Sequence, residues 1–366
     1  MSDTHRRYYA IRRALLQLLP TEPTGHAARH FMTLVSLICG MIGSHSVQLP
    51  KIACCMPLGP QQRESHIKRI QRWLQNDRID TGIHYLPYAQ YIVQKCAQDQ
   101  IIIAIDGSVV ARGCVALMAS MIYHNRALPL TWLVKSGKKG HFSEEMHCSI
   151  LDQLKPIIPP QRSITIVGDG EFDNIEFLKK ITAYGWTYVC RTASSTLIYP
   201  SEHDNFPIGT VRAEFDTIIE IPAVCITQKR YGPVHALVYW DGVAKEPIYL
   251  ITTLNTSGCA ISCYKRRFII ETFFSDQKSR GFGLESSHLR APVRVQRLLL
   301  AACLAYVWIV LLGVQAATAQ WQARIHRGDR CDVSLFQLGT RFLSYCLTEW
   351  LTIPETFQRF TNMCST

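Results

Sequence analysis

The sequence lacks the two closely spaced pairs of cysteines that a structural zinc cluster uses. Its fourteen cysteines are scattered along 366 residues without one Cys-x-x-Cys, and Cys259 and Cys263, separated by three residues, have no companion pair. Structural zinc modules take their ligands from closely spaced pairs. A zinc cluster is therefore not expected, and the pattern favours free thiols in a reducing compartment.

The sequence also lacks an apolar targeting segment at its start and any internal repeat or low-complexity stretch. The first residues, MSDTHRR, do not contain the apolar region of a secretory signal peptide. We therefore expect a cytoplasmic protein. A chain of 366 residues has room for two or three structural units and a large core.

Negative charge is scarce relative to positive charge. Lys and Arg number 39 against 28 Asp and Glu, which gives a formal net charge of +11. This balance favours an anionic partner, nucleic acid before a membrane surface. Charge alone does not decide the question, because basic chains that bind no nucleic acid exist.

One long hydrophobic run bears on whether the chain is soluble. Residues 298–314 are seventeen consecutive apolar residues, preceded by Arg294 and Arg297. This length is at the lower limit for a membrane-spanning helix. Ala and Cys are plentiful in the run, and it follows a helix with candidate active-site residues. A helix buried in the middle of an α/β core is therefore the better interpretation.

Residues 1–95 are expected to be helical and basic. The clearest helix is 63–76, whose apolar face is made of Ile67, Ile70, Trp73 and Leu74. Three basic side chains lie away from that face and are candidates for contacts with DNA phosphates: Lys68, Arg69 and Arg72. Together with the segment 49–56 and the Gly-Pro turn between them, this helix is compatible with a helix-turn-helix. A plain helical bundle with a basic surface is the alternative.

Two aspartates follow short apolar runs that are typical of buried strands. The first run, 101–105, ends at Asp106, and the second, 164–167, is followed by Gly168 and Asp169. A carboxylate at the tip of a central strand is partly desolvated, so it should be protonated, paired or bound to a metal ion. For either aspartate alone, an Asp-Gly turn is the simpler interpretation.

Three strands, a helix, a strand, a helix and a strand are predicted in this order after residue 100. The first three strands are expected to form an antiparallel meander with its first turn at residues 106–108; their ranges are 101–105, 109–118 and 128–134. Ser143 is expected to cap the first helix and Asp173 the second. Residues 136–140, Ser-Gly-Lys-Lys-Gly, could clamp a phosphate or be only a solvated turn.

Four residues of one predicted helix, 264–278, combine charges of both signs on one face. At about 100° per residue, they fall inside an arc of about 60°: they are Tyr264, Arg267, Glu271 and Lys278. A carboxylate between cations suits a site that holds a divalent metal ion and a phosphodiester together. The alternative is a solvated helix face with an Arg267–Glu271 pair.

This spacing resembles, without a gap, the Tyr-Arg-Glu-Lys signature of DDE transposases from prokaryotic insertion sequences. Asp106 and Asp169 stand where that family has its first and second aspartates, and the similarity extends over residues 45–345. The resemblance implies an α/β fold with a ribonuclease H-like catalytic core at 96–345 and a β-rich insertion at about 191–255. An all-helical DNA-binding domain at 1–95 would precede the core, and a tail at 346–366 would follow it. Within the insertion, separate strands are expected at 210–221 and 224–228.

The resemblance also implies roles for the site residues. Two Mg²⁺ ions, with Mn²⁺ as a substitute, would be bound by three carboxylates: Asp106, Asp169 and Glu271. Asp106 would be shared by both ions, and Glu171 is an alternative ligand or a solvated loop residue. The DNA backbone near the cleaved end would be held by Tyr264, Arg267 and Lys278.

The implied reaction is excision of an element followed by transfer of its 3′-hydroxyl ends into target DNA. A homodimer would hold two element ends on double-stranded DNA, in the cytoplasm and associated with the nucleoid. Two other classes are left open, a metal-dependent structure-selective nuclease and an inactive DNA-binding relative of transposases. A strand-transfer assay separates a transposase from the first, and metal-dependent plasmid nicking separates it from the second.

Overall fold

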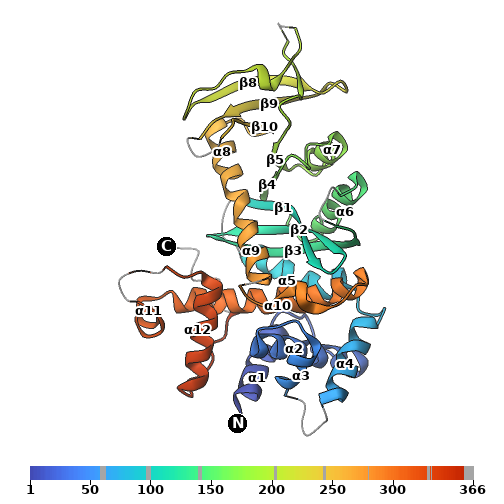
Figure 1. The fold of residues 1–366 in the computed structure, drawn as a ribbon, viewed down its shortest axis with the longest axis vertical. Coiled ribbons are helices and arrows are strands. Elements are labelled where there is room, and N and C mark those ends of the chain that lie inside the picture. The colour runs from blue at the N-terminus through green and yellow to red at the C-terminus, as the bar shows by residue number, and fades with distance from the viewer. Residues whose placement is uncertain are drawn as a thin grey trace.

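The computed structural model has a helical N-terminal part at one end, a sheet through its middle and β-rich structure at the other end (Figure 1). It describes residues 1–57, 63–95, 100–138, 142–201, 204–241, 245–278, 280–327, 330 and 332–357. The predicted basic loop at 136–140, the Gly-Pro turn at 59–60 and the tail at 346–366 lie wholly or partly outside the described residues.

Helices alone are described in the N-terminal part. They are α1 (Asp3–Leu16), α2 (Gly25–Ser44), α3 (Leu49–Cys54), α4 (Arg63–Gln75) and α5 (Thr81–Lys95). Helix α4 buries the face predicted for it, with Ile70, Trp73 and Leu74 inside. The part is compatible with the predicted all-helical domain. Because the turn between α3 and α4 is outside the described residues, the helix-turn-helix stays a prediction.

The strands of the described residues form one mixed sheet, in the order β3-β2-β1-β4-β5-β10-β9-β8-β6-β7. Strand β1 is antiparallel to β2 but parallel to β4, and β4 is parallel to β5. With helices on its faces, this sheet confirms the predicted α/β class. The first strands are β1 (Gln100–Ala111), β2 (Cys114–Tyr123), β3 (Arg126–Ser136), β4 (Ser163–Gly168) and β5 (Thr187–Arg191). The others are β6 (Leu197–Tyr199), β7 (Phe206–Pro207), β8 (Ile218–Ile226), β9 (Tyr231–Tyr239) and β10 (Ile248–Thr252).

Strand β1 runs through the position where a turn was predicted. Asp106 and Gly107 pair with Met118 and Leu117 of β2, so Asp106 lies within the strand and not at its tip. The turn comes later, at Gly113, which has a φ of +74°. Gly107 is extended because it pairs with β2, and the ring of Phe142 packs where a Cβ of residue 107 would lie. The prediction of a turn at 106–108 was therefore wrong.

The two helices beside the central strands begin with side-chain caps. Ser143 accepts the backbone N–H of Met146 and caps α6 (Glu144–Leu154), as predicted. Helix α7 (Ile175–Ala183) is capped by Asn174, whose side chain accepts the N–H of Phe177. The prediction of Asp173 as the cap was wrong, because its carboxylate instead accepts the hydroxyl of Thr192 at 2.7 Å.

The β-rich segment extends the central sheet. Strand β10 pairs with β5 in antiparallel register, with Leu250 opposite Arg191, and β9 continues the sheet from β10. The two strands predicted at 210–221 and 224–228 are one strand, β8, which begins only at Ile218. A short 3-10 turn, η1 (Ile208–Thr210), precedes it. The segment is therefore rich in strands as predicted, but its sheet is continuous with the core.

The predicted helix 264–278 is interrupted. It consists of α8 (Ser257–Lys265), the 3-10 turn η2 (Arg266–Phe268) and α9 (Ile269–Gln277). After it come η3 (Leu284–Ser287), α10 (Pro292–Ala316), α11 (Ala319–Ile325) and α12 (Leu335–Thr348). In Figure 1, α8 and α9 descend beside the sheet from β10 toward β3, and α10 crosses beneath it.

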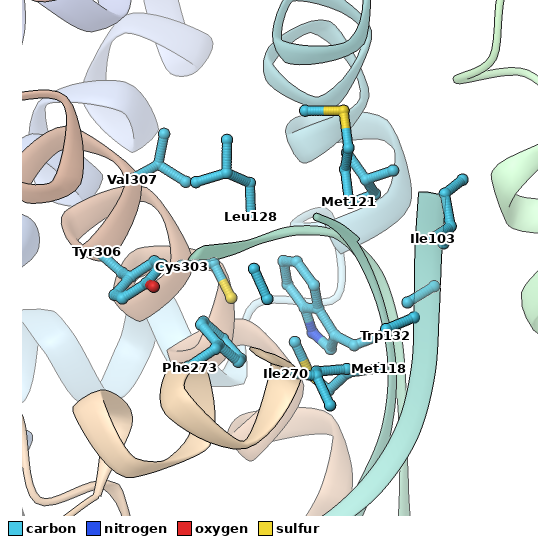
Figure 2. Packing of buried hydrophobic residues seen from close by; sticks show 14 of the residues in the cluster. Ile103, Met118, Met121, Leu128, Trp132, Ile270, Phe273, Cys303, Tyr306 and Val307 are labelled. Carbon is cyan, nitrogen blue, oxygen red and sulfur yellow. The ribbon is translucent and has the colours of Figure 1, made fainter. Parts of the chain in front are cut away.

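The long apolar run is the core of α10. Two helices of the described residues, α2 and α10, are long and apolar enough to cross a membrane, and the apolar window of α10 is 100% buried inside the protein. Figure 2 shows Tyr306 and Cys303 of α10 beside Phe273 of α9 and Trp132 of β3. The rings of Phe273 and Tyr306 meet edge to face, with centroids 4.9 Å apart. In this structure the run is a buried core helix, as predicted.

Candidate active site

The two aspartates belong to neighbouring parallel segments, Asp106 within β1 and Asp169 directly after β4. The last pair in register between β1 and β4 is Ala104 with Val167, and each aspartate lies two residues further along the chain. Parallel strands are about 4.8 Å apart, so Asp106 and Asp169 are adjacent at this level of the sheet. Asp169 directly follows the end of β4, as predicted.

Asp106 carries a negative charge that its surroundings disfavour. Burial raises its pKa to about 6, the Arg267 guanidinium opposes this rise, and the charges of Asp169 and Glu271 add to it. Its Oδ1 accepts the backbone N–H of Gly107 at 2.7 Å. A carboxylate in this state gains from a nearby cation, because the cation offsets both desolvation and like-charge repulsion.

Glu271 faces this pair of aspartates from the first turn of α9. Its side chain is 61% exposed, and its Oε1 is 4.0 Å from Nη2 of Arg267. It is close enough to Asp106 to raise the pKa of that residue. Glu271 therefore has room to turn toward a ligand without disturbing the core.

Arg267 lies between the carboxylates. Its Nη1 is 3.4 Å from Oδ2 of Asp106, and the side chain is only 8% exposed. The guanidinium packs over the rings of Phe268 at 4.3 Å and Tyr264 at 5.8 Å. Because η2 tightens the chain at this point, Arg267 points toward β1 while Glu271 stays at the surface.

Tyr264 and Lys278 do not share an ideal helix face with Arg267. Tyr264 is buried, and burial raises the pKa of its phenol while Arg267 and Arg191 lower it. Lys278 lies at the end of α9 with a non-helical ψ of −116°. Its Nζ is 3.1 Å from Oε1 of Glu285. The predicted arc of four side chains is therefore divided among three elements.

The donor set suits a hard divalent cation, which prefers carboxylate oxygens. The charge of Asp106, which Arg267 offsets only in part, fits such an ion, and the exposed Glu271 is available to it. Across the described ranges, however, no group of three or more His, Cys, Asp or Glu side chains has the spacing of a formed metal site. The shared metal site of Asp106, Asp169 and Glu271 thus stays a prediction.

Two of the three basic residues predicted on α4 are exposed, and the third is half-buried. Lys68 and Arg72 are exposed, whereas the Nε of Arg69 donates to the hydroxyl of Thr33 on α2 at 3.1 Å. Lys68 and Arg72 are therefore more available to DNA phosphates than Arg69. Helix α4 lies at the opposite end of the molecule from β8 and β9 (Figure 1).

Three charged contacts of the site residues or of α9 were not predicted. Glu285 meets Lys278, Arg126 meets Asp276 of α9, and His147 meets Glu171. Arg126 and Asp276 are 150 residues apart, and no local pattern joins the members of the other pairs. These contacts could be identified only from the tertiary structure.

Comparison with known proteins matches the central part of the chain. Residues 97–308, more than half of the sequence, match a family model described as "Transposase DDE domain". A search of curated proteins found no match. Among solved structures, the chain is similar to the piggyBac transposase synaptic complex with hairpin DNA, with 11% identity and a TM-score of 0.45. The alignment covers 100% of this chain and 76% of that one.

Proposed function

Because the chain belongs to the DDE transposase family, we propose that it cleaves DNA at the ends of an insertion element and joins the 3′-hydroxyl ends to target DNA. Members of this family in general cut and transfer DNA with the help of divalent metal ions. The proposal places the chain in the Tyr-Arg-Glu-Lys group from prokaryotic insertion sequences. Its support is the spacing of Tyr264, Arg267, Glu271 and Lys278.

The observation that carries the proposal is the environment of Asp106. Its carboxylate lies on β1, beside the strand β4 that Asp169 directly follows, and the charges of both Asp169 and Glu271 raise its pKa. Arg267 offsets this repulsion only in part, because the pKa of Asp106 is still raised to about 6, so a further cation would stabilise the three acids. The strand order β3-β2-β1-β4-β5 around them supports a ribonuclease H-like core.

In the proposed mechanism, Asp106, Asp169 and Glu271 would hold two Mg²⁺ ions, which would supply activation of the attacking oxygen and neutralisation of the leaving one. Arg267 stabilises the phosphodiester, since its planar guanidinium can exchange the carboxylate of Asp106 for a phosphate. Stacking against Tyr264 and Phe268 limits the orientations of that guanidinium.

Two further parts of the surface bind DNA in this proposal. Lys278 contacts the backbone near the cleaved end after leaving Glu285. Lys68 and Arg72, with a lesser contribution from Arg69, contact phosphates of the element end. Two ends must be joined, so a homodimer on double-stranded DNA in the nucleoid region of the cytoplasm completes the proposal.

A plasmid carrying two element ends tests the function. The full chain should nick it and join the ends to a second plasmid only when Mg²⁺ or Mn²⁺ is added. Glu271→Gln should reduce both reactions by about 100-fold or more, because several kcal/mol of charge stabilisation are lost. It should still bind the ends, since the side chain is 61% exposed and the fold does not depend on it.

Glu246→Gln is the matched control, because Glu246 is exposed on the loop before β10. It should keep full activity. Wild-type cleavage by Glu271→Gln would remove this residue from the mechanism. Nicking without joining would point to a nuclease, and binding without nicking would point to an inactive relative.

A further inference from the structure

Glu171 connects Asp169 to the loop that precedes α6. Its backbone N–H donates to Oδ1 of Asp169 at 3.0 Å. Its side-chain Oε1 accepts the backbone N–H of Phe142. The side chain is 18% exposed, so these contacts are shielded from water. Glu171 thus links Asp169, a candidate metal ligand, to Phe142, which lies 27 residues before Asp169 in the chain.

Phe142 also packs against the part of β1 that contains Asp106. Its ring occupies the space in which a Cβ of residue 107 would lie, directly after Asp106 in β1. Phe142 is itself 7% exposed. A shift of the Phe142 backbone would therefore be felt at Gly107. The chain of contacts from Asp169 through Glu171 and Phe142 ends beside Asp106.

His147 fixes the Glu171 side chain from the interior. The ring is 2% exposed on α6, and its Nε2 is 3.5 Å from Oε1 of Glu171. Its Nδ1 is 3.0 Å from Nδ2 of Asn174. Since Oδ1 of Asn174 already accepts the N–H of Phe177 as the α7 cap, the amide nitrogen faces the ring as a donor.

The tautomer of His147 follows from this geometry. Nδ1 must accept the hydrogen bond from Asn174, so the neutral ring carries its proton on Nε2, which lies 3.5 Å from Oε1 of Glu171 without hydrogen-bond geometry. The Asn174 cap of α7 and the His147 side chain of α6 therefore place an N–H group 3.5 Å from one carboxylate oxygen. That oxygen also receives the N–H of Phe142.

We infer that Glu171 and His147 are positioning residues that hold Asp169 at the correct place beside Asp106 for metal binding. This inference rests on the proposed function. It differs from the alternative in which Glu171 is itself a ligand, because its Oε1 is directed at Phe142 and His147. Outer hydrogen-bond partners of this kind orient ligands and strengthen metal binding.

The test measures binding of Mn²⁺ alone to the full chain, by electron paramagnetic resonance titration. Glu171→Ala should weaken Mn²⁺ binding by about tenfold, the lower end of the loss when an outer partner is removed. Glu171→Gln should stay within about threefold of wild type, because its amide oxygen can still accept the N–H of Phe142. Both should keep the wild-type affinity for DNA.

His147 provides a second pair of variants in case Glu171→Ala does not fold. His147→Phe keeps the ring that packs on Phe172 at 4.7 Å but removes the donor, so it should weaken Mn²⁺ binding. His147→Gln restores a donor and should recover most of the binding. Glu176→Gln is the control, since Glu176 is exposed and pairs with Lys179 at the surface.

The outcomes separate this inference from the proposed function. Asp169→Asn should abolish Mn²⁺ binding if the function is right, and equal binding by Asp169→Asn and wild type overturns both ideas. A loss with Asp169→Asn but none with Glu171→Ala or His147→Phe overturns the positioning role alone. If Glu171→Gln loses as much Mn²⁺ binding as Asp169→Asn, Glu171 is itself a ligand. That result also overturns the positioning role.

Discussion

Arg267 and Asp106 form an ion pair that joins the turn before α9 to the middle of β1. Nη1 and Oδ2 are 3.4 Å apart, across 161 residues of sequence. The pair holds the helix that carries Glu271 against the strand that carries Asp106. A DNA phosphate bound at this site would therefore compete with the carboxylate of Asp106 for the guanidinium of Arg267.

The first prediction concerns the pH dependence of cleavage. Asp106 must be ionised to hold a cation, and its pKa is about 6, so activity should fall as pH drops through this value. Arg267 lowers that pKa. In Arg267→Gln the acidic limb of the pH–rate profile should therefore move up by about one pH unit, measured at subsaturating metal. Arg266→Gln is the control, and an unmoved limb in Arg267→Gln would separate Arg267 from the ionisation of Asp106.

A second prediction concerns the buried pair of Asp276 and Arg126. Oδ2 and Nη1 are 3.3 Å apart, and the side chains are 3% and 13% exposed. Arg126→Met should cost about 3 kcal/mol of unfolding free energy, because it leaves a buried carboxylate without its partner. Urea unfolding at pH 7.5 measures this cost. A loss near zero would mean that the pair does not anchor α9.

The same pair makes a third, pH-dependent prediction. Burial raises the pKa of Asp276 from 3.8 to about 6 despite Arg126. The folded state then binds more protons than the unfolded state between these values, so stability is highest below them and falls as pH rises through about 6. Asp276→Asn removes the titration. Its stability relative to wild type should improve by about 2 kcal/mol between pH 4 and pH 7.5 in urea unfolding. A constant difference would contradict the raised pKa.

A fourth prediction uses the contact of Lys278 with Glu285. Lys278→Ala should weaken DNA binding and reduce the slope of log K against log salt by about one, because one phosphate contact is lost. Glu285→Gln should strengthen binding, since Lys278 is released from a carboxylate 3.1 Å away. In the double variant the gain should disappear. Glu246→Gln controls for the change in net charge, and an equal gain there would show that Glu285 acts only through that charge.

The fifth prediction tests the crossing of α10 and α12. A Cβ on Gly313 would overlap the carbonyl oxygen of Leu335, and one on Gly339 would overlap that of Ile309. Neither backbone can move without separating the helices. Gly313→Ala and Gly339→Ala should each lower the unfolding free energy by about 1–3 kcal/mol in urea. Gly258→Ala is the control, because nothing lies within 4 Å of the added carbon.

The position of Asp106 shows how much of the structure the local sequence can predict. An apolar run before Asp-Gly predicts a strand and then a turn, and the strand is present. The turn is not, because Phe142 packs on Gly107 and β2 pairs with the residues that follow. Neither contact is encoded near residue 106. The sequence identified Asp106 as a candidate site residue, but it did not predict that Asp106 lies inside the strand.

Amino-acid order by itself determined the features that depend on near neighbours. The apolar run of α10 and the Ser143 cap of α6 follow from helical periodicity and local hydrogen bonding. Tertiary structure alone decided that β10 joins β5, that Arg267 meets Asp106, and that His147 faces Glu171. These contacts join segments far apart in the chain, and which ones form depends on how the apolar faces of the whole sheet and its helices are buried together.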